Sequence, residues 1–175
     1  MSPYTWRRQA ARVVLLDRQD RVLLIRASDP ANRAKGHWWE IPGGGIEGGE
    51  PSGHAARREL YEETGLSEVE MGPCVWRQHV TFEFAGIRFD QDEWVHVARC
   101  DGGDYQPAGL EHLEAAAFHE AKWWALAELA VLDGSLGNRV LPPWLPAQLP
   151  TVLSELFSGG AWPAEPIDLG HVGPA

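Results

Sequence analysis

Three glutamates at helical spacing are the residues of this sequence that most clearly could do chemistry. Glu59, Glu62 and Glu63 lie at i, i+3 and i+4, so on a helix their carboxylates project from one face. Carboxylates held this close repel one another unless a cation lies among them, and Mg²⁺ prefers oxygen ligands of this kind. The alternative is the acidic solvent face of an amphipathic helix, and the helix taken alone favours it, since surface glutamates are common.

The residues around the three glutamates change that balance in favour of a metal site. The 23 residues from Gly44 to Leu66 read Gly44-x5-Glu50-x7-Arg58-Glu59-Leu60-x-Glu62-Glu63-x-Gly65-Leu66. This pattern matches the Nudix box at every specified position, so the sequence resembles the Nudix hydrolase family (MutT-like). A weaker resemblance covers Trp39–Gly44, before the box, and Trp123–Leu129, far beyond it.

The resemblance implies a fold, a reaction and a cofactor. The fold is α/β, an α/β/α sandwich with a mixed central sheet and a loop-helix-loop catalytic motif. The reaction is hydrolysis of a nucleoside diphosphate linked to another moiety, as in a nucleoside triphosphate or a nucleotide sugar. The cofactor is Mg²⁺ or Mn²⁺, which the resemblance assigns to Glu59, Glu63 and the backbone carbonyl of Gly44, with Glu62 as a further ligand or a support.

The resemblance also implies roles in catalysis and substrate binding. Glu59 is the position that in some members orients or deprotonates the attacking water, and the sequence leaves its role here open. Arg58 and Glu50 would form an orienting charge pair, and Gly65 would end the helix. We predict catalytic roles for Glu59, Arg58, Glu62 and Glu120, and substrate contacts from Arg26, Trp39, Gly43, Gly45 and Glu50.

A further acidic residue outside the box is expected, because family members often place one before the segment that resembles Trp123–Leu129. Glu111, Glu114 and Glu120 are the candidates, and we rank Glu120 first. A solvated loop glutamate is the competing interpretation for each of them.

Aromatic and basic residues provide candidate substrate contacts. Trp38, Trp39 and Trp94 are candidates for stacking on a base, although core filling is the default for a tryptophan. Arg26 and Arg33 could contact a distal phosphate. The proline and tyrosine that mark ADP-ribose and dinucleoside polyphosphate hydrolases are absent between residues 74 and 104, so the substrate is predicted only as a class.

Composition limits the partners. The 175 residues include 25 acidic and 15 basic ones, a net charge of −10, and no basic patch, which argues against nucleic-acid polymers and leaves a phosphorylated nucleotide as the expected partner. Two cysteines without a CxxC pair, and no apolar stretch long enough for a membrane span, predict a cytoplasmic protein that does not bind membranes. The resemblance also allows a homodimer.

The hydrophobic pattern and the turn residues of the sequence predict the helices and strands that must position the glutamates. We predict a hairpin of Ala10–Leu16 and Val22–Ile25, a specialised loop at Pro42–Gly45, and a helix over Ala55–Thr64 capped by Gly65. An antiparallel pair, Glu68–Phe84 and Ile87–Arg99, precedes an acidic loop at Asp101–Gly109. The remainder is predicted as a strand at Phe118–Trp124, a short helix at Leu126–Leu132, a connection at Leu141–Pro150 and a helix at Thr151–Phe157. We expect one domain over residues 1–160 and a loosely ordered tail over 161–175.

Two other functions fit the same fold. A Nudix module that senses a nucleotide without hydrolysing it usually lacks some box glutamates, whereas all three are present here. A related isomerase of isoprenoid diphosphates needs a catalytic cysteine in a context that neither Cys74 nor Cys100 shows.

Overall fold

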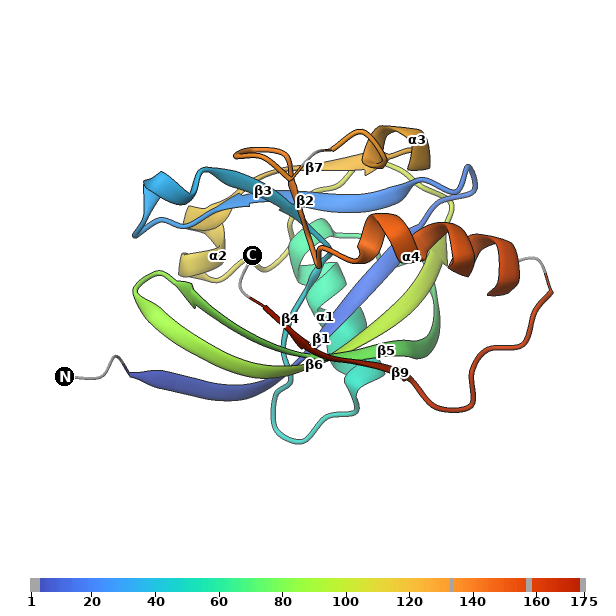
Figure 1. The fold of residues 1–175 in the computed structure, drawn as a ribbon, viewed down its shortest axis with the longest axis horizontal. Helices are drawn as coiled ribbons and strands as arrows, with labels where there is room; N and C mark the ends of the chain where they lie inside the picture. The colour runs from blue at the N-terminus through green and yellow to red at the C-terminus, as the bar shows by residue number, and fades with distance from the viewer. Residues whose placement is uncertain (1–3, 133, 157–158, 174–175) are drawn as a thin grey trace.

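A computed structural model describes residues 4–132, 134–156 and 159–173 (Figure 1). Within them, nine strands form one mixed, curled sheet in the order β8-β3-β2-β1-β6-β5-β9, with β4 paired to β1 and β7 paired to β2. The strands are β1 (Thr5–Leu16), β2 (Val22–Ser28), β3 (His37–Glu40), β4 (Gly43–Gly45), β5 (Val69–Phe84), β6 (Ile87–Cys100), β7 (Phe118–Trp124), β8 (Arg139–Leu141) and β9 (Ile167–Val172). The helices are α1 (Ser52–Thr64), α2 (His112–Ala117), α3 (Leu126–Leu129) and α4 (Leu145–Thr151), and the short helical turns are η1 (Arg33–Lys35) and η2 (Val152–Leu156).

Alternation along β1 explains why helices cover both faces of the sheet. Val13 and Leu15 pack in one buried cluster with Leu60 of α1, whereas Val14 and Leu16 pack in a second cluster with Leu145 of α4. Successive side chains of a strand point to opposite faces, so a strand that is apolar throughout must be covered twice. The predicted α/β/α sandwich with a mixed sheet is confirmed.

Helix α1 forms where the sequence predicted a helix. Ala56 and Leu60 are fully buried and carry the face that packs on the sheet. Gly65 ends the helix in the left-handed conformation at φ 72°, and its N–H donates to the carbonyl of Tyr61 at 2.7 Å. Its Cβ would lie 2.2 Å from the carbonyl oxygen of Gln106, so only glycine fits there.

The predicted hairpins are confirmed. β1 and β2 are antiparallel neighbours, and β5 and β6 pair antiparallel around the turn at Ala85–Gly86, where φ is 52° and 79°. The predicted strand at Phe118–Trp124 is also confirmed as β7. The predicted helix at Leu126–Leu132 is shorter and ends at Leu129.

Other segments differ from the prediction because their secondary structure depends on contacts with segments far away in the chain. Pro42–Gly45, predicted as a loop, contains β4, which pairs with Ala10–Arg12 of β1. The Pro-rich connection contains α4, and η2 continues it through Leu156; Phe157 lies outside the described residues. Within the segment 161–175, expected to be a loosely ordered tail, Ile167–Val172 form β9 beside β5. The helices in the described part of the chain are too short or too polar to cross a membrane.

Candidate active site

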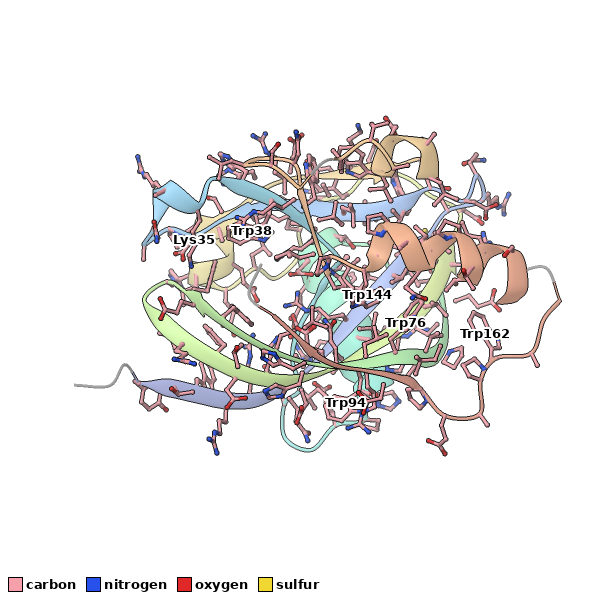
Figure 2. The ribbon with its side chains drawn as sticks, in the orientation of Figure 1. Lys35, Trp38, Trp76, Trp94, Trp144 and Trp162 are labelled. Carbon is pink, nitrogen blue, oxygen red and sulfur yellow. The ribbon has the colours of Figure 1, made fainter. Side chains whose placement is uncertain are left out.

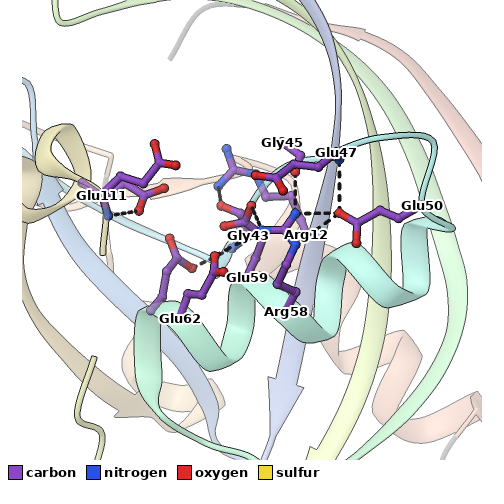
Figure 3. Close-up of polar contacts among 11 residues, drawn as sticks. Arg12, Gly43, Gly45, Glu47, Glu50, Arg58, Glu59, Glu62 and Glu111 are labelled. Carbon is purple, nitrogen blue, oxygen red and sulfur yellow. Dashed lines mark hydrogen bonds and ion pairs between the residues drawn. The ribbon is translucent and has the colours of Figure 1, made fainter. Parts of the chain in front are cut away.

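The glutamates of α1 lie against the glycines of β4 at one end of a cleft (Figure 3). Glu59 and Glu63 are buried, with relative exposures of 5% and 8%, and Glu62 is half-buried. Glu63 Oε2 accepts a hydrogen bond of 2.8 Å from the backbone N–H of Gly43. The structure thus brings the three predicted carboxylates together on one helix face, beside the backbone of the predicted ligand Gly44.

The glycines of β4 are required by close approach. A Cβ on Gly44 would lie 2.6 Å from the carboxylate of Glu59, and a Cβ on Gly43 would lie 2.2 Å from the carbonyl oxygen of Ala11. Gly43 also has φ +141°, a conformation that L side chains rarely adopt. The Glu59 carboxylate therefore lies directly against the backbone of the glycine strand.

Arg58 ties the cluster together. Its Nη1 donates to Glu59 at 2.9 Å and to Glu62 at 3.1 Å, while its Nη2 donates to Glu50 at 2.6 Å and to the carbonyl of Gly45 at 2.9 Å. The hydrogen bond from Arg58 lowers the pKa of Glu50, which matches the predicted charge pair. One guanidinium thus fixes the positions of three carboxylates and of the loop after β4 (Figure 3).

The surroundings of the carboxylates nearest β4 disfavour their ionised form. Burial raises the pKa of Glu59 to about 7, and Glu114 and Glu62 raise it further against the opposing effect of Arg58. Burial also raises the pKa of Glu63 well above its usual range. Both carboxyls would ionise more easily beside a cation.

This donor set fits a hard divalent cation. The groups are carboxylate oxygens and the Gly44 carbonyl, the ligands that Mg²⁺ and Mn²⁺ prefer, and the absent Cβ of Gly44 lets the Glu59 carboxylate lie against the glycine backbone. In this structure Arg58 forms ion pairs with Glu59 and Glu62. Within residues 4–132, 134–156 and 159–173, no three acidic, histidine or cysteine side chains lie close enough together to hold a metal ion.

The cleft has a volume of about 530 Å³ and runs from β4 to the loops beside β3 and β5. Its walls combine aromatic and basic side chains. The aromatic ones are Trp38, Phe82, Phe84, Phe89 and Phe118, and the basic ones are Arg8, Arg12, Lys35, Arg88 and Arg139. Glu40, Glu63, Glu83, Glu93 and Glu114 line the same cleft, so its basic groups balance its acidic ones, unlike in the whole chain with its net charge of −10, and the aromatic walls suit a planar apolar group.

Among the basic residues that line the cleft, Arg8 and Arg12 lie beside the glycines of β4, and neither was predicted from the sequence. Arg12 Nη1 donates to the carbonyl of Gly43 at 3.2 Å, and a Cβ on Gly45 would lie 3.4 Å from Arg8 Nη1. Burial opposes a charge on Arg12, but Glu93, Glu40 and Glu63 together raise its pKa, so the guanidinium stays charged. The signal was the i, i+4 spacing of Arg8 and Arg12, which places both side chains on one face of β1.

A buried polar network holds Arg12 in place. Glu93, 4% exposed, accepts hydrogen bonds from Arg12 Nε at 3.2 Å and from the side-chain amides of Gln78 and Gln91. Gln78 in turn accepts a hydrogen bond of 2.7 Å from the indole of Trp144. Because the buried charges are paired and hydrogen-bonded, the guanidinium is held rigidly in the cleft.

Several predicted contacts lie elsewhere. Arg26 pairs with Glu120 across strands β2 and β7 at 3.1 Å, and both side chains are more than a third exposed. Trp39 is buried in the core against Trp124, with ring centroids 4.9 Å apart. Neither Arg26, Trp39 nor Glu120 is among the residues that line the cleft.

Neighbours of these residues occupy the cleft instead. Trp38 lines it, as do Ile25 and Ala27 on β2, because alternate residues of a strand face opposite sides. Of the three acidic candidates, Glu114 lines the cleft. Trp94 lies well away from Trp38, where its ring stacks under the guanidinium of Arg77 at 5.2 Å (Figure 2).

Comparison with known proteins identifies the class to which this fold and site belong. A model of the NUDIX domain matches residues 6–145, and the chain therefore belongs to the Nudix family of hydrolases. An RNA pyrophosphohydrolase of Erythrobacter litoralis is 43% identical over 127 residues, which cover 66% of this chain and 74% of that protein. Members of the family generally use divalent metal ions.

Two further relatives set the extent of the similarity. An RNA pyrophosphohydrolase of Rhodopseudomonas palustris is 39% identical over 59 residues, 33% of this chain, so the chain spans about a third (35%) of that relative's length. The crystal structure of a NUDIX hydrolase from Nitrosomonas europaea superimposes with a TM-score of 0.60 at 18% identity, covering 99% of this chain and 80% of that one. At that identity the likeness supports the fold alone.

Proposed function

We propose that this chain is a divalent-metal-dependent pyrophosphohydrolase that cleaves a nucleoside diphosphate linked to another moiety. One observation carries the proposal: the Glu59 carboxylate lies against Gly44, Glu63 accepts from Gly43, and Arg58 holds Glu62 to Glu59, where Gly43, Gly44 and Glu63 line a cleft with aromatic and charged walls. Negative charge protects a pyrophosphate from nucleophilic attack, so its hydrolysis needs positive charge on the phosphate oxygens and an activated water.

In the proposed reaction, the oxygen of a water molecule bonds to one phosphorus while the bridging P–O bond breaks and its electron pair leaves with the departing phosphate. Glu59, Glu62, Glu63 and the Gly44 carbonyl would hold Mg²⁺ or Mn²⁺, which supplies positive charge for the phosphate oxygens when bound. Arg58 fixes Glu59 at Oε1, and the carboxylate is then oriented to take the proton of the water.

The basic residues of the cleft have a separate task. Arg8 and Arg12, beside β4, would bind the phosphate oxygens through charge-assisted hydrogen bonds. Trp38 and the phenylalanines would contact the nucleobase. The cleft lies within the usual size range of small-molecule sites.

The test is chromatographic detection of the products, a nucleotide and a phosphate ester or pyrophosphate, released by the purified protein with Mg²⁺, with Mn²⁺ and with EDTA. The substrates are ATP, GTP, ADP-ribose, a nucleotide sugar and diadenosine tetraphosphate; a 5′-triphosphorylated RNA oligonucleotide is included because relatives are named RNA pyrophosphohydrolases. Metal-dependent turnover that Glu59→Gln abolishes supports the proposal. Absence of turnover on every compound, with a nucleotide still raising the melting temperature, overturns it in favour of a nucleotide-binding module.

A further inference from the structure

Strand β9 (Ile167–Val172) follows the residues that the family model matches, 6–145, and adds a parallel strand to the edge of the sheet beside β5. In Figure 1 it crosses the front of the molecule and ends near its centre. Val172 pairs with Val80, and both line the cleft, as does Gly173 after the strand. A segment outside the matched region therefore contributes to the walls of the proposed substrate site.

A bulge determines which side chain of β9 reaches the cleft. Asp168 pairs with Arg77, but His171, three residues on, pairs with His79, so β9 contains one extra residue. Gly170 lies in this bulge with φ +65°, and its N–H donates to Asp168 Oδ1 at 2.8 Å. A one-residue shift exchanges the faces of a strand, and Val172 therefore shares the face of Val80.

Few side-chain contacts hold β9. Leu169 packs on the core, and the ring nitrogen Nε2 of His171 lies 3.3 Å from Thr81 Oγ1 on β5. Most of the strand is exposed, including Ile167 at 48%. A change at the end of β9 therefore alters the cleft without removing much of the core.

Residues from both edges of the sheet meet around this end of the cleft. Val172 ends β9 and Gly173 follows it, whereas Pro142 and Pro143 follow β8 at the opposite edge. Together with Val80 and Phe82 of β5 they form an apolar surface, which suits a planar base better than a phosphate.

We propose that Val172 and Gly173 are specificity-determining residues that contact the nucleobase of the substrate and limit its size. This inference rests on the proposed function, because the nucleobase belongs to the substrate proposed there. The two residues touch only the part of the substrate that does not react, so they act on binding and not on the chemical step.

The test introduces the same side chain at three positions. Val172→Phe and Gly173→Phe fill the proposed base site, and Gly173 accepts a side chain because no heavy atom lies within 4 Å of its Cβ position. Ile167→Phe, on the exposed start of β9, is the matched control. We expect each cleft variant to raise KM for ATP and GTP by about tenfold or more while kcat stays within about threefold, and the control to behave as the wild type.

A second readout separates this inference from the proposed function. Binding of the α,β-methylene analogues of ATP and GTP, whose α–β bridge resists hydrolysis, is measured by titration calorimetry for all four proteins. If the wild type binds an analogue but hydrolyses nothing, the proposed function fails, and weaker binding by the cleft variants alone still supports the inference. Unchanged KM and affinity in Gly173→Phe, or a wild type that binds neither analogue, overturns it; if Val172→Phe does not fold, Gly173→Phe decides.

Discussion

The backbone N–H of Gly43 and the side chain of Glu63 form a buried hydrogen bond of 2.8 Å between residues 20 positions apart. This bond joins β4 to α1, so the glycine strand and the acidic helix are held as one unit. It also supplies a donor to a carboxyl that burial would otherwise leave poorly solvated.

Replacement of this carboxyl tests the metal site. In Glu63→Gln the amide oxygen still accepts from Gly43, so we expect the fold to be kept, while loss of a charged ligand lowers turnover by about 10²- to 10³-fold. Turnover and melting temperature are measured together, with Glu68→Gln, an exposed glutamate beyond the helix, as the control. Wild-type turnover in a folded Glu63→Gln protein would contradict the assignment.

Replacement of Gly44 tests whether the close approach of its backbone to the Glu59 carboxylate matters for activity. The Cβ of Gly44→Ala would displace the Glu59 carboxylate, the mobile end of a side chain, so we expect a small change in stability and a fall in kcat of about tenfold or more. Gly53→Ala is the control, because its Cβ makes an ordinary contact of 3.5 Å with His96 and alanine favours the helix by up to about 1 kcal/mol. Equal activity of the two variants would show that the position of Glu59 is not critical.

Two acidic residues compete for the role outside the box. Glu114 lines the cleft, and its charge acts on Glu59, whereas Glu120 forms an exposed ion pair with Arg26. We expect Glu114→Gln to lower kcat/KM by about 10²-fold and Glu120→Gln to change it less than about twofold, since exposed ion pairs contribute little. Steady-state kinetics on both variants decides, and the reverse order would restore Glu120 as the functional residue.

His96 gives a pH dependence of stability that is independent of the metal site. It is 6% exposed, its Nε2 lies 2.9 Å from Ser52 Oγ, and Gly72 and Cys74 of β5 lie beside it. Burial lowers its pKa in the folded state, so its neutral form is favoured by folding. Its contribution is complete above the unfolded pKa of about 6.5 and is lost as the pH falls toward the folded pKa, by at most about 1.4 kcal/mol per pH unit.

Urea unfolding of the wild type and of His96→Gln at pH 7.5 and 5.5 measures this contribution. The carboxyls titrate in both proteins, so their effect cancels in the comparison. We expect the wild type to lose more unfolding free energy than the variant between the two values. Parallel losses in the two proteins would mean that His96 is as easily protonated in the folded state as in the unfolded one.

The sequence predicted local features well because local chemistry determines them. Helix α1 has good helix formers between Pro51 and Gly65, and the two hairpins have polar or glycine turns between apolar runs. The spacing of Glu59, Glu62 and Glu63 depends only on helix geometry, so their shared face was predictable. β4 and β8 were not, because each has three residues and forms only through pairing with a distant strand.

Some predicted substrate contacts lie away from the cleft for a different reason. Trp38 and Trp39 are adjacent aromatic residues, and composition does not tell which of them faces the cleft; the strand register does. Glu120 was ranked above Glu114, and α2, which carries Glu114, was not predicted; the spacing of Glu111 and Glu114 fits a helix start, where Glu114 Oε2 accepts a hydrogen bond from the Glu111 N–H at 2.9 Å.

The parallel pairing of β1 with β6 has a consequence for synthesis of the chain. Thr5 pairs with Arg88 and Leu16 with Arg99, so each residue of β1 meets a partner 83 positions later. On the ribosome, the apolar end of β1 stays without this partner until residue 99 has left the exit tunnel. Closing so long a loop slows folding, and during that interval this edge of β1 stays unpaired and open to pairing with other chains.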